Sequence, residues 1–111
     1  MISYVLALML AAGPASADKL ALARREYSHC LKAFMDQSVK DKMTKEAFAT
    51  ALPTACSDKL QTFRTYSISS DTAVGIKRAV AEENAASEVQ DLMANTKELF
   101  TDYTTPEPAP N

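Results

Sequence analysis

The sequence predicts an all-α protein, in which a disulfide-stapled antiparallel helical hairpin is followed by a long third helix. Three segments repeat apolar residues at intervals of three and four, the spacing of one face of an α-helix. The only two cysteines, Cys30 and Cys56, each lie 13 residues from Met43, which sits in a polar run that suits the bend of a hairpin. At a rise of about 1.5 Å per residue, both thiols would lie at the same height on facing helices, where a disulfide can form. We therefore expect a small three-helix bundle.

The N-terminal segment has the pattern of a secretory signal. Residues 1–17 carry no charge, and residues 2–12 are almost wholly apolar but shorter than the roughly 20 residues that span a bilayer. A Gly-Pro pair at 13–14 should break any helix, and the small residues at 15–17 suit signal peptidase, although no Lys or Arg precedes the apolar run. We expect cleavage before Asp18, a periplasmic or secreted location, and no membrane span in the mature protein.

Export favours a structural disulfide between the two cysteines. Cysteines in small exported domains are usually bonded, because the compartment is oxidising. Closing a loop of 25 intervening residues should stabilise the fold by roughly 3–4 kcal/mol in the chain-entropy model. The alternative is a pair of buried free thiols.

The first helix should run from Asp18 or Lys19 to about Lys40. Its apolar stripe contains Leu20, Tyr27, Cys30, Leu31, Phe34 and Met35. Arg24 lies at the edge of the stripe, where its aliphatic stem can pack while its charge stays in water.

The second helix should open at Thr44, a good N-cap residue, and carry Phe48 and Leu52 on its buried face. Pro53 removes a backbone hydrogen bond inside this pattern. Either the helix stops near Leu52 and a new one starts with Pro53 in its first turn, or one helix kinks there. In both cases the stripe continues with Cys56, Leu60, Phe63 and Ser67.

The third helix should run from Thr72 to about Tyr103, capped by Ser70 or Asp71 after a break in the polar run 69–72. Its apolar face contains Ile76, Val80, Ala85, Val89, Leu92, Thr96, Leu99 and Tyr103. From Ala85 the steps alternate between four and three, close to a heptad seam. The stripe predicts either packing against the hairpin or a homodimer through this helix. Gly75 would sit in the first turn and permit close backbone approach.

The domain is expected to span residues 18–103. Residues 104–111 include three prolines and predict a solvated, disordered tail.

Charge is divided along the chain. Residues 18–70 carry nine Lys or Arg against six Asp or Glu, a net charge of +3, whereas residues 71–111 carry three against eight, a net charge of −5. The candidate partner surface consists of Lys40, Lys42, Lys45, Glu82, Glu83, Glu88 and Asp91. An acidic pI near 5.3, together with the expected export, disfavours binding to nucleic acid.

The residue counts favour a protein without catalysis. A single histidine, His29, excludes multi-histidine metal sites, and one glycine in the mature chain excludes a glycine-rich phosphate loop. The chain also lacks CxxC and G-x-S-x-G motifs. We therefore expect no catalytic, cofactor or metal site.

The sequence has amphipathic helices but no motif of an active site. It therefore predicts a non-catalytic exported protein that acts by contact with an unknown protein partner. That contact would be either partner binding or chaperone-like binding. The alternative is a carrier of small apolar ligands with a cavity between the helices. The side chains that would line such a cavity are Phe34, Met35, Phe48, Phe63, Met93 and Phe100. The same residues would also fill an ordinary core.

Overall fold

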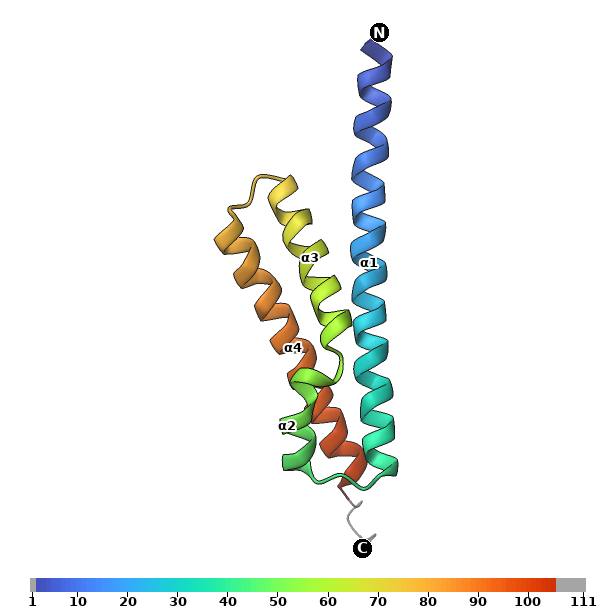
Figure 1. Ribbon diagram of the computed structural model, residues 1–111, viewed down its shortest axis with the longest axis vertical. Helices are drawn as coiled ribbons and strands as arrows, with labels where there is room; N and C mark the ends of the chain where they lie inside the picture. The colour runs from blue at the N-terminus through green and yellow to red at the C-terminus, as the bar shows by residue number, and fades with distance from the viewer. Residues whose placement is uncertain (1, 106–111) are drawn as a thin grey trace, which may run out of the picture.

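The computed structural model describes residues 2–105 of the 111-residue chain, with side chains described from residue 17 to residue 105. Four helices make up almost all of this part: α1 (Ile2–Lys40), α2 (Lys45–Ala55), α3 (Ser57–Ala73) and α4 (Arg78–Thr104). Figure 1 shows α1 and α4 running in the same direction, while α2 and α3 follow one another in the opposite direction. The all-α prediction is confirmed, with four helices in place of three.

α1 begins further toward the N-terminus than the sequence predicts. We expected a helix from Asp18 after a break at the Gly-Pro pair, yet α1 runs from Ile2 through both residues. A proline inside a helix removes one hydrogen bond, whereas the Ala, Leu and Met residues that flank this pair are among the best helix formers. The helix says nothing about cleavage before Asp18, which stays a prediction.

The hairpin bend lies where the sequence places it. α1 ends at Lys40 and α2 begins at Lys45. Between them, the hydroxyl oxygen of Thr44 accepts a hydrogen bond from the backbone N–H of Ala47 at 3.1 Å. The predicted N-cap is confirmed, because this bond satisfies a donor that the first turn leaves without an intrahelical partner.

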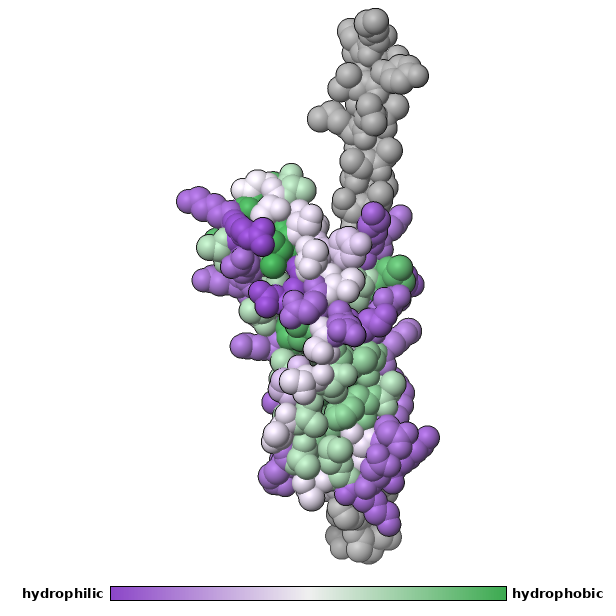
Figure 2. Space-filling view, viewed as in Figure 1, coloured by the Kyte–Doolittle hydropathy of each residue, from purple (hydrophilic) through white to green (hydrophobic). Residues whose placement is uncertain are grey.

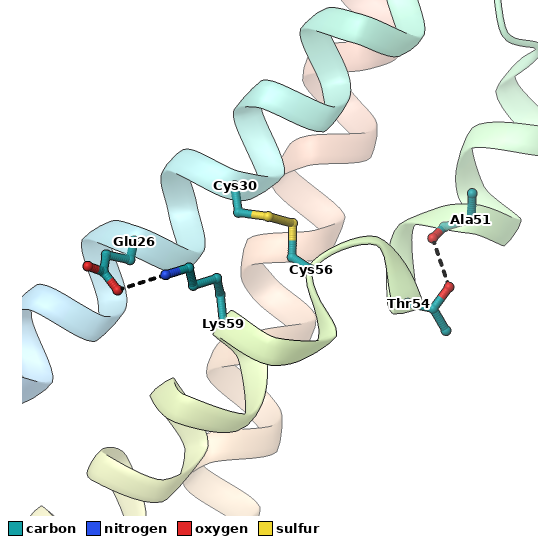
Figure 3. The surroundings of a disulfide bond; sticks show 6 residues. All are labelled: Glu26, Cys30, Ala51, Thr54, Cys56 and Lys59. Atoms are coloured by element: carbon teal, nitrogen blue, oxygen red, sulfur yellow. Dashed lines mark hydrogen bonds and ion pairs between the residues drawn. A yellow bond between two sulfur atoms is a disulfide. The ribbon is translucent and has the colours of Figure 1, made fainter.

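The disulfide between Cys30 and Cys56 is also confirmed. The two Cα atoms lie 6.0 Å apart, and the bond joins the middle of α1 to the junction between α2 and α3 (Figure 3). One turn away on each helix, the ammonium of Lys59 donates to Glu26 at 3.2 Å. Both contacts hold α3 against α1.

The second helix divides at Cys56, and not at Pro53. α2 continues through Pro53 to Ala55, and α3 begins at Ser57. Pro53 has no N–H, so the helix lacks one hydrogen bond there, yet α2 continues for two residues beyond it. The chain turns at Cys56, where φ is −122° and ψ is 37°. The predicted division into two helices is therefore confirmed, but it lies at Cys56, so Pro53 is in the last turn of α2 and not in the first turn of the new helix.

The next break was placed too early. α3 continues through the polar run 69–72 and ends at Ala73. Hydroxyl side chains in this run are compatible with a helix, as Thr72 shows by donating to the carbonyl of Ser69 at 3.1 Å. The turn lies instead around Gly75, whose φ of 92° ends the helix. A Cβ atom at Gly75 would meet nothing within 4 Å, so the predicted close approach does not occur.

The core is filled by side chains from all four helices. Its buried members are Ala23, Tyr27, Leu31, Met35, Phe48, Leu52, Cys56, Phe63, Val89 and Phe100. The ring of Phe48 stacks on Phe100, with centroids 4.1 Å apart, and on Phe34, with centroids 5.4 Å apart. A smaller cluster of Ile68, Ala81 and Ala85, with Ile76 packed against it, lies between α3 and α4.

The buried face of α4 differs from the predicted stripe. Its buried residues are Ala81, Ala85, Val89, Thr96 and Phe100. Three predicted members are exposed: Val80 by 45%, Leu99 by 39% and Tyr103 by 64%. The difference lies at the two ends of α4, with Val80 in its first turn and Leu99 and Tyr103 close to its C-terminal end, where Phe100 is the residue buried against Phe48.

The C-terminal boundary moves by one residue. α4 ends at Thr104, which we had placed in the tail, and the chain is extended at Thr105. The proline-rich residues 106–111 lie outside the described residues.

Candidate functional site

α1 and α4 lie side by side and in the same direction, and an ion pair links them. A guanidinium nitrogen of Arg24 lies 3.0 Å from a carboxylate oxygen of Glu88. The guanidinium carbon of Arg24 also lies 5.6 Å from the ring centroid of Phe63, a cation–π contact, so the charged end of Arg24 itself approaches the edge of the core. This pair links the basic and acidic parts of the chain, although both side chains stay partly in water.

Below this ion pair runs a shallow hollow that we call the α1–α4 groove. It is lined by Ser28, Leu31, Lys32 and Met35 of α1 and by Leu92, Asn95, Thr96, Leu99 and Tyr103 of α4. Its volume is about 170 Å³, below the roughly 300 Å³ at which pockets for drug-sized ligands begin. The groove is therefore better suited to another protein surface than to an enclosed small molecule.

The apolar part of the groove comes from residues that the sequence placed in the core. Leu92 is half-buried, while Leu99 and Tyr103 are exposed on the side of α4 that faces α1. Tyr103 also lines two neighbouring hollows, one with Val39 and Lys40 and the other with Val39 and Lys42. The apolar surface thus continues to the hairpin bend.

A charged pair stands at the edge of the groove. The ammonium of Lys32 donates to the carboxylate of Asp36 at 2.9 Å, and both side chains are exposed. The hydrogen bond and the negative charge of Asp36 raise the pKa of Lys32, with a smaller contribution from Tyr103. Lys32 therefore stays protonated at the edge of an apolar surface.

The candidate partner surface divides into two separate regions. Lys40, Lys42 and Lys45 are exposed around the bend, where Lys42 lies near Tyr103. The four acidic residues, Glu82, Glu83, Glu88 and Asp91, lie 12 to 21 positions before Tyr103 on α4, or roughly 18–32 Å along the helix. A single small ligand cannot touch both regions.

Two of these carboxylates already have partners. Glu88 pairs with Arg24, and Glu82 accepts from Arg78 at 3.1 Å. Glu82 and Arg78 border a second, polar hollow between α3 and α4. Its other lining residues are Gln61, Arg64, Thr65, Ile68, Ser69 and Thr72.

Residues with catalytic potential are not gathered into a site. His29 is exposed on α1, and the neighbouring Cys30 is held in the disulfide. Within residues 17–105, no three His, Cys, Asp or Glu side chains lie close enough together to hold a metal ion. The described part of the chain also contains no helix that is both long and apolar enough to cross a membrane.

The chain matches no family model, no curated protein and no solved structure. Its function must therefore be argued from its own residues.

Two features of the groove escaped prediction from the sequence. The pairing of Arg24 with Glu88 depends on the order of the helices in space, which spacing along the chain does not give. The exposure of Leu99 and Tyr103 gave no signal either, because both residues continue the steps of three and four that predict a buried face.

Proposed function

We propose that this is an exported, non-catalytic helical protein that acts by binding a polypeptide on its α1–α4 groove. The observation that carries the proposal is the exposed position of Leu99 and Tyr103 beside Met35, on a surface edged by charged side chains. Large apolar side chains grouped in this way are typical of protein contact surfaces. The apolar run 2–12, the small residues at 15–17 and the disulfide support export.

Figure 2 shows how apolar and charged surfaces are arranged on one face of the molecule. Apolar side chains gather in the lower half of this face, in the region of α1 and α2, and charged side chains lie along the edges; the α1–α4 groove itself has no lining residue from α2. This division resembles the apolar centre and polar rim of protein interfaces.

The carrier of small apolar ligands remains an alternative prediction. Phe48, Phe63 and Phe100 would have to line its cavity, but these rings are buried in stacked contacts with other rings. Contact at the groove therefore has the stronger physical support.

Site-specific photocrosslinking tests the proposal. We would replace Leu99 by the photoreactive residue p-benzoylphenylalanine in the protein expressed by its own organism. We expect a discrete crosslinked product that contains a second polypeptide, because the reactive ring would lie in the groove.

Val80 offers a matched control. Its exposed fraction is close to that of Leu99, but it lies 19 positions away on α4, or about 28 Å along the helix. The same substitution at Val80 should give no such product. Equal crosslinking at both positions, or none at Leu99, would contradict the placement of the contact surface.

A further inference from the structure

We infer that a second copy of this chain covers the α1–α4 groove, related to the first by a two-fold axis parallel to the helices. The inference rests on the proposed function, because it names the polypeptide that the groove binds. It is carried by the charges along the two sides of the groove and by their positions along the helices.

Apart from the paired Lys32 and Asp36, the exposed charges that flank the groove are basic on α1 and acidic on α4. On α1, Arg25 and Lys40 are exposed, and on α4, Asp91 and Asp102 are exposed. None of these four side chains forms an ion pair with another residue in the described part of the chain. All four charges are therefore available to a second molecule.

The helical positions place these charges at matching heights. Arg24 pairs with Glu88, and Val39 shares a hollow with Tyr103, so positions 64 apart in the sequence lie level on α1 and α4. Asp91 then lies within two residues of the level of Arg25, and Asp102 within two residues of the level of Lys40. Two residues correspond to about 3 Å along a helix, which flexible side chains can bridge.

A two-fold axis parallel to the helices brings these oppositely charged residues of two copies together. It places α1 of one copy opposite α4 of the other and leaves every height unchanged. Arg25 then meets Asp91 of the second copy, Lys40 meets Asp102 of the second copy, and both contacts occur twice. An axis perpendicular to the helices would instead bring α4 against α4 and oppose its carboxylates, which is unfavourable.

The same arrangement covers the apolar residues of the groove. Tyr103 would face Val39 of the second copy, because this pair is also 64 positions apart, and Leu99 would be covered one turn before it on α4. The surface from Arg24 to Lys40 is about 24 Å long. Two helices of this length make a small interface, so we expect a dimer of modest affinity that high salt weakens further.

Complementary charge exchange tests the inference. The first variant carries Arg25→Glu and Lys40→Glu, and the second carries Asp91→Lys and Asp102→Lys. We would measure the association of the full, disulfide-bonded mature protein by sedimentation equilibrium from about 1 μM to about 1 mM, the range that a small interface requires. Each variant alone should associate at least about tenfold more weakly than the unchanged protein, because like charges would then face one another.

An equimolar mixture of the two variants should restore a one-to-one dimer at close to the original affinity. In the mixture every acidic side meets a basic one, and a variant that merely folded badly would not be rescued. A control with Lys77→Glu and Asp58→Lys changes the same number of charges at exposed positions outside the groove and outside the candidate partner surface. It should leave association unchanged within about twofold.

A monomer throughout the concentration range would overturn the inference, and so would a dimer that none of the charge changes affects. Failure of the dimer can be distinguished from failure of the proposed function. If the protein is monomeric while p-benzoylphenylalanine at position 99 still captures a different polypeptide, the groove is a contact surface with another occupant. If neither occurs, the proposed function fails as well.

Discussion

Tyr27 shows most clearly what the sequence reveals at the scale of one residue. Its position in the apolar stripe of the first helix predicts burial, and the side chain is 1% exposed. The ring stacks on Phe63, with centroids 6.0 Å apart. Burial was predicted well in the middle of a long helical stripe, because apolar residues on both sides fix which face of the helix is buried. The exposure of Leu99 and Tyr103 was not, because they lie near the end of their helix.

Burial of Tyr27 makes the stability of the fold depend on pH. Desolvation raises the pKa of Tyr27 above its ordinary value of 10.0, because the charged phenolate is disfavoured in the core. The unfolded chain loses this proton at lower pH than the folded one. Stability is therefore fully present below about pH 10 and falls as pH rises beyond it.

The change Tyr27→Phe should reduce this loss above pH 10 while keeping the ring in the core. Melting temperatures measured across alkaline pH would reveal it, with Tyr103→Phe as the control at an exposed tyrosine. Identical alkaline curves for the unchanged protein and Tyr27→Phe would show that burial of this phenol does not govern the effect.

At the scale of elements, the helix ends decide the architecture. The N-cap at Thr44 was readable, because its side chain and position are typical of a helix start. The end of α3 was not, since the polar run 69–72 looked like a break whereas those residues continue the helix. A glycine five residues beyond Ser70 was the better signal, because helices often end with a residue in the left-handed conformation.

α1 and α3 end in the same backbone motif. After α1, the N–H of Met43 donates to the carbonyl of Ser38 at 3.0 Å, and φ of Lys42 is 56°. After α3, the N–H of Ile76 donates to the carbonyl of Asp71 at 3.1 Å, and φ of Gly75 is 92°. This pattern is the Schellman motif, in which glycine is the favoured residue at the left-handed position.

We therefore expect opposite effects of exchanging the residue at these two ends. Lys42→Gly should raise the free energy of unfolding by about 1 kcal/mol, and Gly75→Ala should lower it by about 1 kcal/mol, because a Cβ atom is unfavourable in the left-handed region. Urea denaturation would measure both changes. Lys42→Ala is the control, since it removes the lysine side chain without freeing the backbone. A gain in stability for Lys42→Ala equal to that for Lys42→Gly would assign the effect to the lysine and not to φ.

At the scale of the whole molecule, local sequence patterns predicted the all-α fold class and the Cys30–Cys56 disulfide, but they did not predict the α1–α4 groove. The helical periodicity and the equal distances of both cysteines from the bend were enough for an all-α hairpin. The groove depends instead on α4 lying parallel to α1 with a particular face inward. The contacts that accompany this orientation, Phe100 on Phe48 and Arg24 with Glu88, join residues more than 50 positions apart.

The central claim is that the mature protein is an exported, disulfide-stapled chain that acts through contact at the α1–α4 groove. A native mass spectrum of the protein taken from its own exported fraction tests this claim most directly. We predict a chain that begins at Asp18, has the mass expected for a Cys30–Cys56 disulfide and carries no small-molecule ligand, with part of it seen at twice the monomer mass, as a dimer of modest affinity requires. An uncleaved and reduced chain, or a monomer with a reproducible bound small molecule, would contradict it.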